Sequence, residues 1–393
     1  MARTDDEYAI DEITAELLGL IRSGRAQSRA QLGQLSGFAR ATVASRLDLL
    51  LSADLVKFDE FLRGTGGRPA SRLVLNARRG VLLGADIGGS HTRVAVYDLH
   101  GETLAVSDHV IDVNDGPRSV LGLVGREFDL LVSSHGFAAT DVLGIAIGLP
   151  GPIEQATGRV VRPPTMRGWD GADVRGIFRR RYPRVPVAVD KDANIMAVGE
   201  YHALADPPPD VLLLKVGMGI GGGIIANGQV VRGGQGAAGD LGHLPRTGGA
   251  PCRCGQDGCA EATAGGWAIA HELRAAGFSH VRTSQDIVDL VRDGQPTAVA
   301  LLHRAGQRLG EVLSEAIGVL NPSVIVVGGN LAVANDDLLN VIRHQVATHS
   351  HPLATKGLRI ELGVLGRDAG IRGAGRLAAD AAFEGEALAA LLT

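Results

Sequence analysis

The sequence predicts an α/β protein with a small helical domain at the N-terminus and a larger body built from two similar lobes. Apolar residues recur at helical spacing near the start of the chain, which predicts the helical domain. A pattern of strand, glycine turn and strand begins at Val81 and is repeated from Val211, which predicts a duplicated body. All cysteines lie in one short loop, from Cys252 to Cys259, which predicts a metal site in the second half.

Composition indicates a folded protein with more than one domain. The chain has 393 residues, too many for one ordinary core, and 45% of them are hydrophobic. Its formal net charge of -4 is small, so any surface for nucleic acid has to be local. The acidic start is unlike an export signal, and no apolar run is long enough to cross a bilayer. We therefore expect a cytoplasmic protein without a membrane partner.

The first seventy-odd residues contain three helical segments and a hairpin. After a helix around Ile13–Ile21, Ser28-Arg-Ala-Gln31 is a capping-box pattern that opens a second helix. A turn at 36–38 leads to a third helix at about 39–52, and two short helices about a glycine-containing turn are typical of a helix-turn-helix. Strand segments at 55–58 and 73–75 predict a β-hairpin wing.

Arginine dominates the charge of this segment. Between Leu17 and Leu47 every charged residue is an arginine, which suits contact with phosphates and base edges in a DNA major groove. Two arginines among glycines at the wing tip suit a minor groove or the sugar-phosphate backbone. The alternative is a helical protein-interaction domain with a solvated basic face. The candidate DNA contacts are Arg29, Arg40, Thr42, Ser45, Arg46, Arg63 and Arg68.

Glycine-rich turns follow the first strand of each copy. Glycines let the backbone approach a phosphate closely and offer its N–H groups as donors. One such turn is weak evidence, but two at corresponding places predict a duplicated fold with a cleft between the lobes. For the later glycines at 328–329, ordinary strand-to-helix turn chemistry is an equal alternative. The candidate nucleotide-binding residues are Asp86, Gly88, Gly89, Ser90, Thr92, Gly217, Gly219, Gly221, Gly328 and Gly329.

The cysteine loop predicts a structural zinc site. His243 precedes Cys252, Cys254 and Cys259 at short range, and three thiolates with one imidazole form a closed tetrahedral shell. Glycines between the cysteines allow the loop to fold around one ion. The alternative is a group of three buried free thiols.

The same loop carries a resemblance to a known family. Cys-x-Cys-Gly-x-x-Gly-Cys-x-Glu, preceded by Gly-His, resembles the signature of the ROK family of repressors, open reading frames and sugar kinases. The wing ahead of Asp86-Ile-Gly-Gly is similar to the repressor branch. The resemblance implies an actin-like, sugar kinase-like, two-lobed α/β domain with a sugar held in the cleft. The implied division is a DNA-binding domain at 1–78, a first lobe at 79–195 joined by a C-terminal helix at 374–393, and a second lobe at 196–373.

The resemblance also implies a sugar site. Asp192 stands where the kinases have their general base, and His243 would hold zinc with one ring nitrogen and a sugar hydroxyl with the other. Three departures stand out: Lys191 replaces the usual Asn, Asp240 the usual Glu, and Met218 the usual Thr. The implied sugar-binding residues are Gly148, Pro150, Gly151, Lys191, Asp192, Asp240, His243 and Glu261.

These observations favour a sugar-responsive repressor. It is expected to act as a homodimer or a dimer of dimers on an inverted repeat in operator DNA, with a nearly neutral sugar or sugar derivative as effector. The first alternative is an ATP-dependent hexose kinase, or a bifunctional kinase-regulator, that uses Mg-ATP with Asp192 as its general base. The second is a scaffold of kinase ancestry that binds no DNA.

Overall fold

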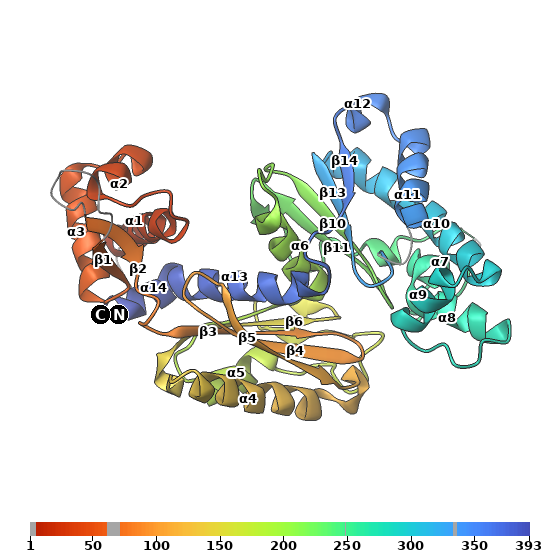
Figure 1. Ribbon diagram of the computed structural model, residues 1–393, viewed down its shortest axis with the longest axis horizontal. Coiled ribbons are helices and arrows are strands. Elements are labelled where there is room, and N and C mark those ends of the chain that lie inside the picture. Colours follow the sequence, from red (N-terminus) through yellow and green to blue (C-terminus); the bar gives the residue numbers. More distant parts are fainter. Residues whose placement is uncertain (1–4, 61–70, 248, 333–335) are drawn as a thin grey trace.

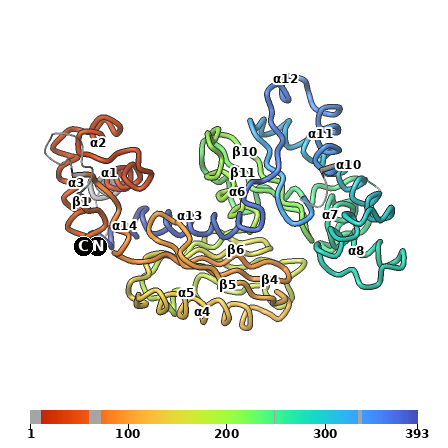
Figure 2. Tube along the Cα trace, viewed as in Figure 1, coloured from red at the N-terminus to blue at the C-terminus, as the bar shows by residue number. Residues whose placement is uncertain are grey.

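The computed structural model describes residues 5–60, 71–247, 249–332 and 336–393. Over these residues, a small domain of three helices and two strands precedes a body with two five-stranded sheets. Figure 1 shows this N-terminal domain at one end of the molecule, beside the last helices of the chain, and Figure 2 shows the same path as a tube. Among the described residues, no helix combines the length and the apolar composition needed to cross a membrane.

The N-terminal domain has the order of elements that its sequence predicts. Ser28 caps the second helix, because its hydroxyl accepts a hydrogen bond from the Gln31 N–H at 3.2 Å. Gly37 ends that helix with a φ of 74°, a left-handed conformation that suits glycine. Arg63 and Arg68 lie outside the described residues. The elements are α1 (Asp5–Arg22), α2 (Arg29–Ser36), α3 (Arg40–Ser52) and the antiparallel pair β1 (Val56–Glu60) and β2 (Ser71–Leu75).

The two sheets of the body share one strand order, which confirms the duplication. In each sheet the central strand is antiparallel to the strand that follows it and parallel to a later one. The first sheet has the order β5 (Thr103–Val110), β4 (His91–Tyr97), β3 (Val81–Ile87), β6 (Val142–Leu149) and β9 (Val187–Lys191). The second has the order β12 (Gln229–Val230), β11 (Ile220–Ala226), β10 (Val211–Val216), β13 (Val324–Gly328) and β14 (Arg359–Leu362).

Each sheet buries its outer face under helices of its own lobe. Apolar side chains of the first sheet pack with those of α4 (Pro117–Ser134) and α5 (Val174–Arg181), which lie below the sheet in Figure 1. A short antiparallel pair, β7 (Ile153–Glu154) and β8 (Arg159–Val160), follows β6. The helices of the second lobe are α7 (Glu261–Ala264), α8 (Gly266–Ala275), α9 (Ser284–Arg292), α10 (Pro296–Leu320), α11 (Asp336–His349) and α12 (Pro352–Thr355).

Two helices pack against each other between the sheets. They are α6 (Asp192–Ala203), which follows the first sheet, and α13 (Ala369–Phe383), which follows the second. Each crosses to the other lobe: α6 lies on β10 and β11, and α13 lies on β3 and β6. Their close approach requires glycine, because a Cβ on Gly199 would lie 2.1 Å from the carbonyl oxygen of Ala369. The chain then ends in α14 (Gly385–Leu391), which contacts α1.

Candidate functional site

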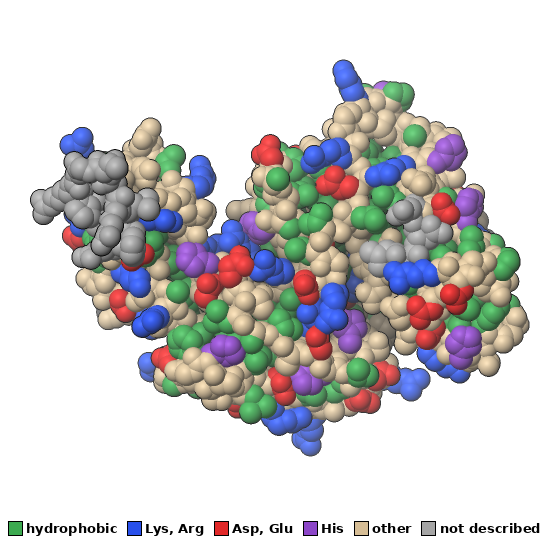
Figure 3. Space-filling model, in the orientation of Figure 1, with side chains coloured by type: hydrophobic (Ala, Val, Ile, Leu, Met, Phe, Trp, Pro, Cys, Tyr) green, Lys and Arg blue, Asp and Glu red, His purple; other side chains and the backbone are tan. Residues whose placement is uncertain are grey.

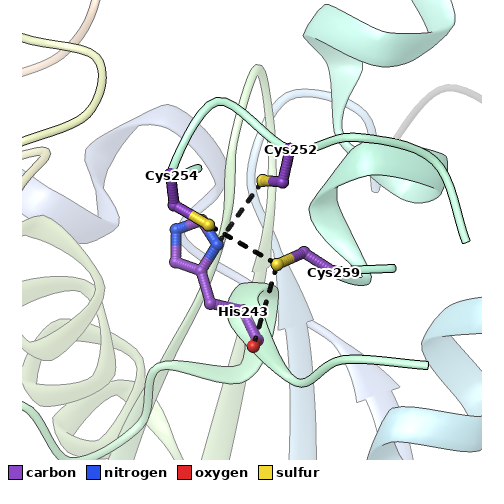
Figure 4. Close-up of side chains that lie close together, drawn as sticks. All are labelled: His243, Cys252, Cys254 and Cys259. Carbon is purple, nitrogen blue, oxygen red and sulfur yellow. Dashed lines mark hydrogen bonds between the residues drawn. The ribbon is translucent and has the colours of Figure 1, made fainter. Parts of the chain in front are cut away.

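The structure brings the four predicted metal ligands together. His243 ends a short 3-10 helix (Leu241–His243), and the cysteines come from the loop that follows it. Their ligand atoms all lie within 4.8 Å of one another (Figure 4). Glycine shapes the loop, since a Cβ on Gly258 would lie 1.8 Å from the carbonyl oxygen of Arg246.

The chemistry of these donors fits a thiophilic divalent cation. Burial, together with the neighbouring thiols, raises the pKa of Cys259 to about 12, and burial also raises the pKa of Cys252. A thiol in such surroundings stays protonated unless a cation stabilises the thiolate. His243 turns its Nδ1 toward the cysteines, 3.7 Å from Cys252 Sγ, so its Nε2 remains for another partner. Sulfur and nitrogen in this number suit tetrahedral Zn²⁺.

A second group of charged side chains lies where the two sheets and α6 meet. Asp192, the first residue of α6, is buried, and its Oδ1 accepts a hydrogen bond from the Ala193 N–H at 2.7 Å. Its Oδ2 accepts a hydrogen bond from the ammonium group of Lys215 on β10. Sequence analysis missed Lys215. Only the strand ends reveal its place, because Lys215, like Asp86, is the residue before the last of its strand.

The electrostatics of this group keep Lys215 charged. Burial lowers the pKa of Lys215, but the carboxylates of Asp192, Asp86 and Glu261 outweigh burial, and the net pKa is raised. Burial raises the pKa of Asp86, and the Asp192 charge raises it further, while Lys215 opposes both. Lys215 therefore offsets the repulsion between two neighbouring carboxylates.

Lys191 is also held by the protein. Its ammonium group donates to the carbonyl oxygen of Ala238, and burial lowers its pKa against the opposing attraction of Asp240. Asp190, which sequence analysis did not select, is 2% exposed and organises the turn before α6. Its carboxylate accepts from Arg232 Nε at 2.7 Å, Asn194 Nδ2 at 2.6 Å and the Lys191 N–H at 2.8 Å.

Glu261 joins the metal loop to the second glycine turn. One carboxylate oxygen accepts from the Ile220 N–H at 2.8 Å, and the other accepts from Trp267 Nε1 at 3.1 Å. Gly219 leaves room for this contact, since a Cβ there would lie 2.8 Å from Glu261 Oε2. Both oxygens are thus engaged within the protein, and the cysteine loop and the turn at 217–221 are fastened to each other.

The remaining predicted body residues lie at the ends of the central strands. Gly148 lies beside Asp86 in the register of β6 and β3, and Pro150 and Gly151 follow that strand. The first glycine turn is closed by a hydrogen bond from the Gly88 N–H to the His91 carbonyl, at 2.8 Å. The second is closed by a bond from the Gly217 N–H to the Gly219 carbonyl, at 3.0 Å. Ser90 is exposed, Thr92 is buried, and Gly221, Gly328 and Gly329 lie on or directly after β11 and β13.

The predicted DNA-contacting residues of α3 lie away from its core face. Arg40 and Ser45 are exposed, whereas Thr42 and Arg46 are half-buried. Arg29 is already engaged: it pairs with Asp48 at 3.3 Å, and its guanidinium lies 5.9 Å from the centre of the Phe58 ring. Figure 3 shows Lys and Arg side chains around the visible face of the N-terminal domain. An open hollow separates this domain from the second lobe in the same view.

The fold and the site define a two-lobed, actin-like α/β protein with a Cys₃His loop. The ROK family model matches residues 82–381, so the chain belongs to the ROK family. A glucokinase of Halalkalibacterium halodurans is 30% identical over 75% of this chain and 94% of its own. The xylose repressor of Bacillus spizizenii is 26% identical over 87% of this chain and 88% of its own.

A solved structure extends the similarity to the N-terminal domain. The crystal structure of a ROK family transcriptional regulator, a homologue of the E. coli MLC protein, matches with a TM-score of 0.81 at 25% identity. That match covers 98% of this chain and 99% of the other. The regulators are therefore similar to this chain over a greater share of its length than the glucokinase is.

Proposed function

We propose that this protein is a sugar-responsive transcriptional repressor of the cytoplasm. One observation carries the proposal: the similarity to a transcriptional regulator covers 98% of the chain and so includes the N-terminal domain. The similarity to the glucokinase covers only 75%. A chain with a small helical domain, which we propose to be a helix-turn-helix, ahead of a sugar kinase-like body fits regulation better than metabolism alone.

The proposed DNA-binding face is the exposed side of α3. Arg40 and Ser45 are free to reach a major groove, with Thr42 and Arg46 beside them. Arg63 and Arg68 are proposed to contact the minor groove or the backbone. Arg29 has a smaller proposed role, because its pairing with Asp48 must be broken or shared before it reaches a phosphate. A homodimer or dimer of dimers would present two such faces to an inverted repeat.

The proposed effector site includes Asp192, Asp240 and His243. A zinc ion on the Cys₃His loop would fix the orientation of the His243 ring and leave Nε2 to a sugar hydroxyl. Gly148, Pro150, Gly151 and Lys191 complete the proposed sugar site. Glu261 contributes by position, since its hydrogen bonds to Ile220 and Trp267 fasten the zinc loop beside that site.

Contacts between helices support a proposed coupling of the two sites. Asp192 begins α6, and α6 packs along α13. At the far end of α13, Asp380 pairs with Arg22 of α1 at 2.5 Å. A sugar that favours one arrangement of α6 and α13 would therefore change how the N-terminal domain is held. We propose that sugar binding weakens operator binding, as expected for release by an inducer.

The second candidate function is sugar phosphorylation, which the presence of Asp192 and of the first glycine turn favours. Against it, Lys215 already engages the carboxylate that would act as base. Incubation of the purified protein with Mg-ATP and a panel of pentoses and hexoses separates the two functions. Formation of ADP that depends on one sugar would establish a kinase.

The experiment that tests the repressor starts from DNA. Purified protein selects fragments from a random duplex library, and footprinting of the selected sequence is expected to show a symmetric site of two half-sites. Each sugar of the panel is then added to the complex, and one is expected to release the protein. The R40A/R46A variant should select no sequence, whereas R126A, which removes an exposed arginine of α4, should select the same one. Failure of the wild type to select any sequence would contradict the proposal.

A further inference from the structure

Asp86 and Lys215 occupy equivalent positions in the two duplicated sheets. Each is the residue before the last of its strand, Asp86 in β3 and Lys215 in β10. Each lies beside a glycine of the neighbouring parallel strand, Gly148 in β6 and Gly328 in β13. The duplication therefore places a carboxylate in one lobe and an ammonium group at the matching point of the other.

The ammonium group lies among acidic side chains. Lys215 hydrogen-bonds to Asp192, and the two side chains are 24% and 11% exposed. Asp86 and Glu261 also attract the Lys215 charge, and Asp86 interacts with both Lys215 and Asp192. The lysines at the outer surface, Lys57 and Lys356, are by contrast exposed. Lys215 thus partly neutralises a local excess of negative charge.

Phosphoryl transfer needs a divalent metal ion, not an ammonium group, beside such carboxylates. Mg²⁺ binds carboxylate and phosphate oxygens and neutralises the charge that develops on the transferred group, and a carboxylate takes the proton of the attacking hydroxyl. Asp86 and Asp192 are oxygen donors of the right kind. Because Lys215 is bound to Asp192 and attracted by Asp86, a divalent cation would meet both a competing ammonium group and its repulsion.

We propose that Lys215 is the residue that makes this site a receptor and not a phosphotransferase: its ammonium group takes the place of a divalent cation between Asp86 and Asp192. The inference deepens the proposed repressor function, because it explains how a sugar can be bound without being phosphorylated. An ammonium group has three N–H donors, and Asp192 uses one. Within the described parts of the chain no other hydrogen bond from this ammonium group is found, so its remaining donors can reach an oxygen of the ligand, and we expect binding to need neither magnesium nor nucleotide.

The test uses Mn²⁺ as a spectroscopic substitute for Mg²⁺ and needs neither sugar nor operator, so it stands apart from the repressor proposal. Electron paramagnetic resonance counts the Mn²⁺ bound by the zinc-loaded, full-length protein. The wild type and K356A are expected to bind none in competition with the buffer. K215A and K215Q are expected to gain about one ion per chain, since two carboxylates then lack their counter-charge. The D192N/K215A variant should lose that ion again.

Three outcomes would overturn the inference. One is Mn²⁺ binding by the wild type that D192N abolishes, and another is no gain in either K215A or K215Q while circular dichroism shows both folded. The third needs no variant: transfer of labelled phosphate from Mg-ATP to a sugar by the wild type. Should K215A and K215Q fail to fold, the wild-type Mn²⁺ and phosphate-transfer measurements still decide the matter. Absence of operator binding would contradict the repressor and leave these results unaffected.

Discussion

Arg22, the last residue of α1, forms an ion pair with Asp380 of α13 at 2.5 Å. Its guanidinium also lies 6.0 Å from the centre of the Phe383 ring, and its carbonyl oxygen lies 3.3 Å from His100 Nδ1. The N-terminal domain is thus held through the end of the chain as well as through the segment that links it to β3. A shift of α13 would therefore act on Arg22 through these contacts.

The first prediction concerns this contact. R22A should reduce the effect of the sugar on operator affinity, from the roughly 5- to 150-fold typical of allosteric coupling toward none. Operator affinity without sugar should change little, because Arg22 is not among the proposed DNA contacts and its side chain pairs with Asp380. Fluorescence anisotropy with and without sugar measures both quantities. R372A, which breaks the pair between α13 and Glu102 within the body, serves as control. An unchanged sugar effect in R22A would show that coupling runs elsewhere.

The second prediction concerns the arginines of α3. If Arg40 contacts a phosphate, R40A should reduce the slope of log K against log salt by about one and leave sequence preference intact. If it reads a base, R40A should instead relax preference at one position of each half-site. Binding measured over a series of salt concentrations and single-base operator variants distinguishes these results. Identical binding by R40A and wild type would remove α3 from the proposed interface.

The third prediction concerns zinc. The wild type should contain about one zinc ion per chain, and C254S should contain far less, because three ligands no longer close the tetrahedral shell. The melting temperature should fall as well, since Glu261 joins the loop to the turn at 217–221. Elemental analysis and calorimetry measure the two effects. Q256A changes an exposed side chain of the same loop and should alter neither. Wild-type protein prepared without chelator and free of zinc would contradict the assignment.

The fourth prediction concerns pH and the buried carboxyl of Glu200. Its oxygens accept from the Val364 and Leu365 N–H groups at 2.9 and 3.1 Å, yet burial raises its pKa above the ordinary value. The native state therefore binds more protons at this group than the unfolded state does, and its contribution to stability falls as pH rises from about 4.5 through the folded-state pKa. The loss is about 1.4 kcal/mol for each unit by which the folded-state pKa exceeds the unfolded one.

Comparison of wild type with E200Q isolates this contribution. The urea midpoint of the wild type, relative to that of E200Q, should fall as pH rises through that window and stay constant above it. E386Q, at an exposed position of α14, should follow the wild type throughout. A difference between wild type and E200Q that does not vary with pH would show that Glu200 has the same proton affinity in both states.

Local signals predicted much of this fold. The Ser28 cap, the turn at Gly37 and the repeated strand pattern each arise from residues close together in sequence, where spacing alone carries the information. The Cys₃His set was accessible for the same reason, because three of its ligands share one loop. The proposed division at residues 78, 195 and 373, like the sugar, nucleotide and DNA contacts, stays a prediction.

Long-range contacts were beyond sequence reasoning. Lys215 and Asp192 are 23 positions apart, and Arg22 and Asp380 are 358 apart, so only the folded chain brings each pair together. The same limit applies to Glu261. It was predicted to bind the sugar, but in the folded chain its carboxylate oxygens accept hydrogen bonds from Ile220 and Trp267. Arg29 was selected because no acidic residue lies between Leu17 and Leu47. Asp48, the residue after Leu47, lies on α3 and pairs with Arg29 on α2.

The crossing of α6 and α13 between the lobes has a consequence for folding during synthesis on the ribosome. The inner face of the first sheet is covered by α13, which is made only after nearly all of the second lobe has been synthesised. A ribosome that has finished β9 has therefore produced a sheet with one apolar face still bare. The first lobe cannot complete its folding during its own synthesis and has to wait for the end of the chain. A premature stop just before residue 369 would leave the inner face of the first sheet uncovered and α6 without the helix that packs against it.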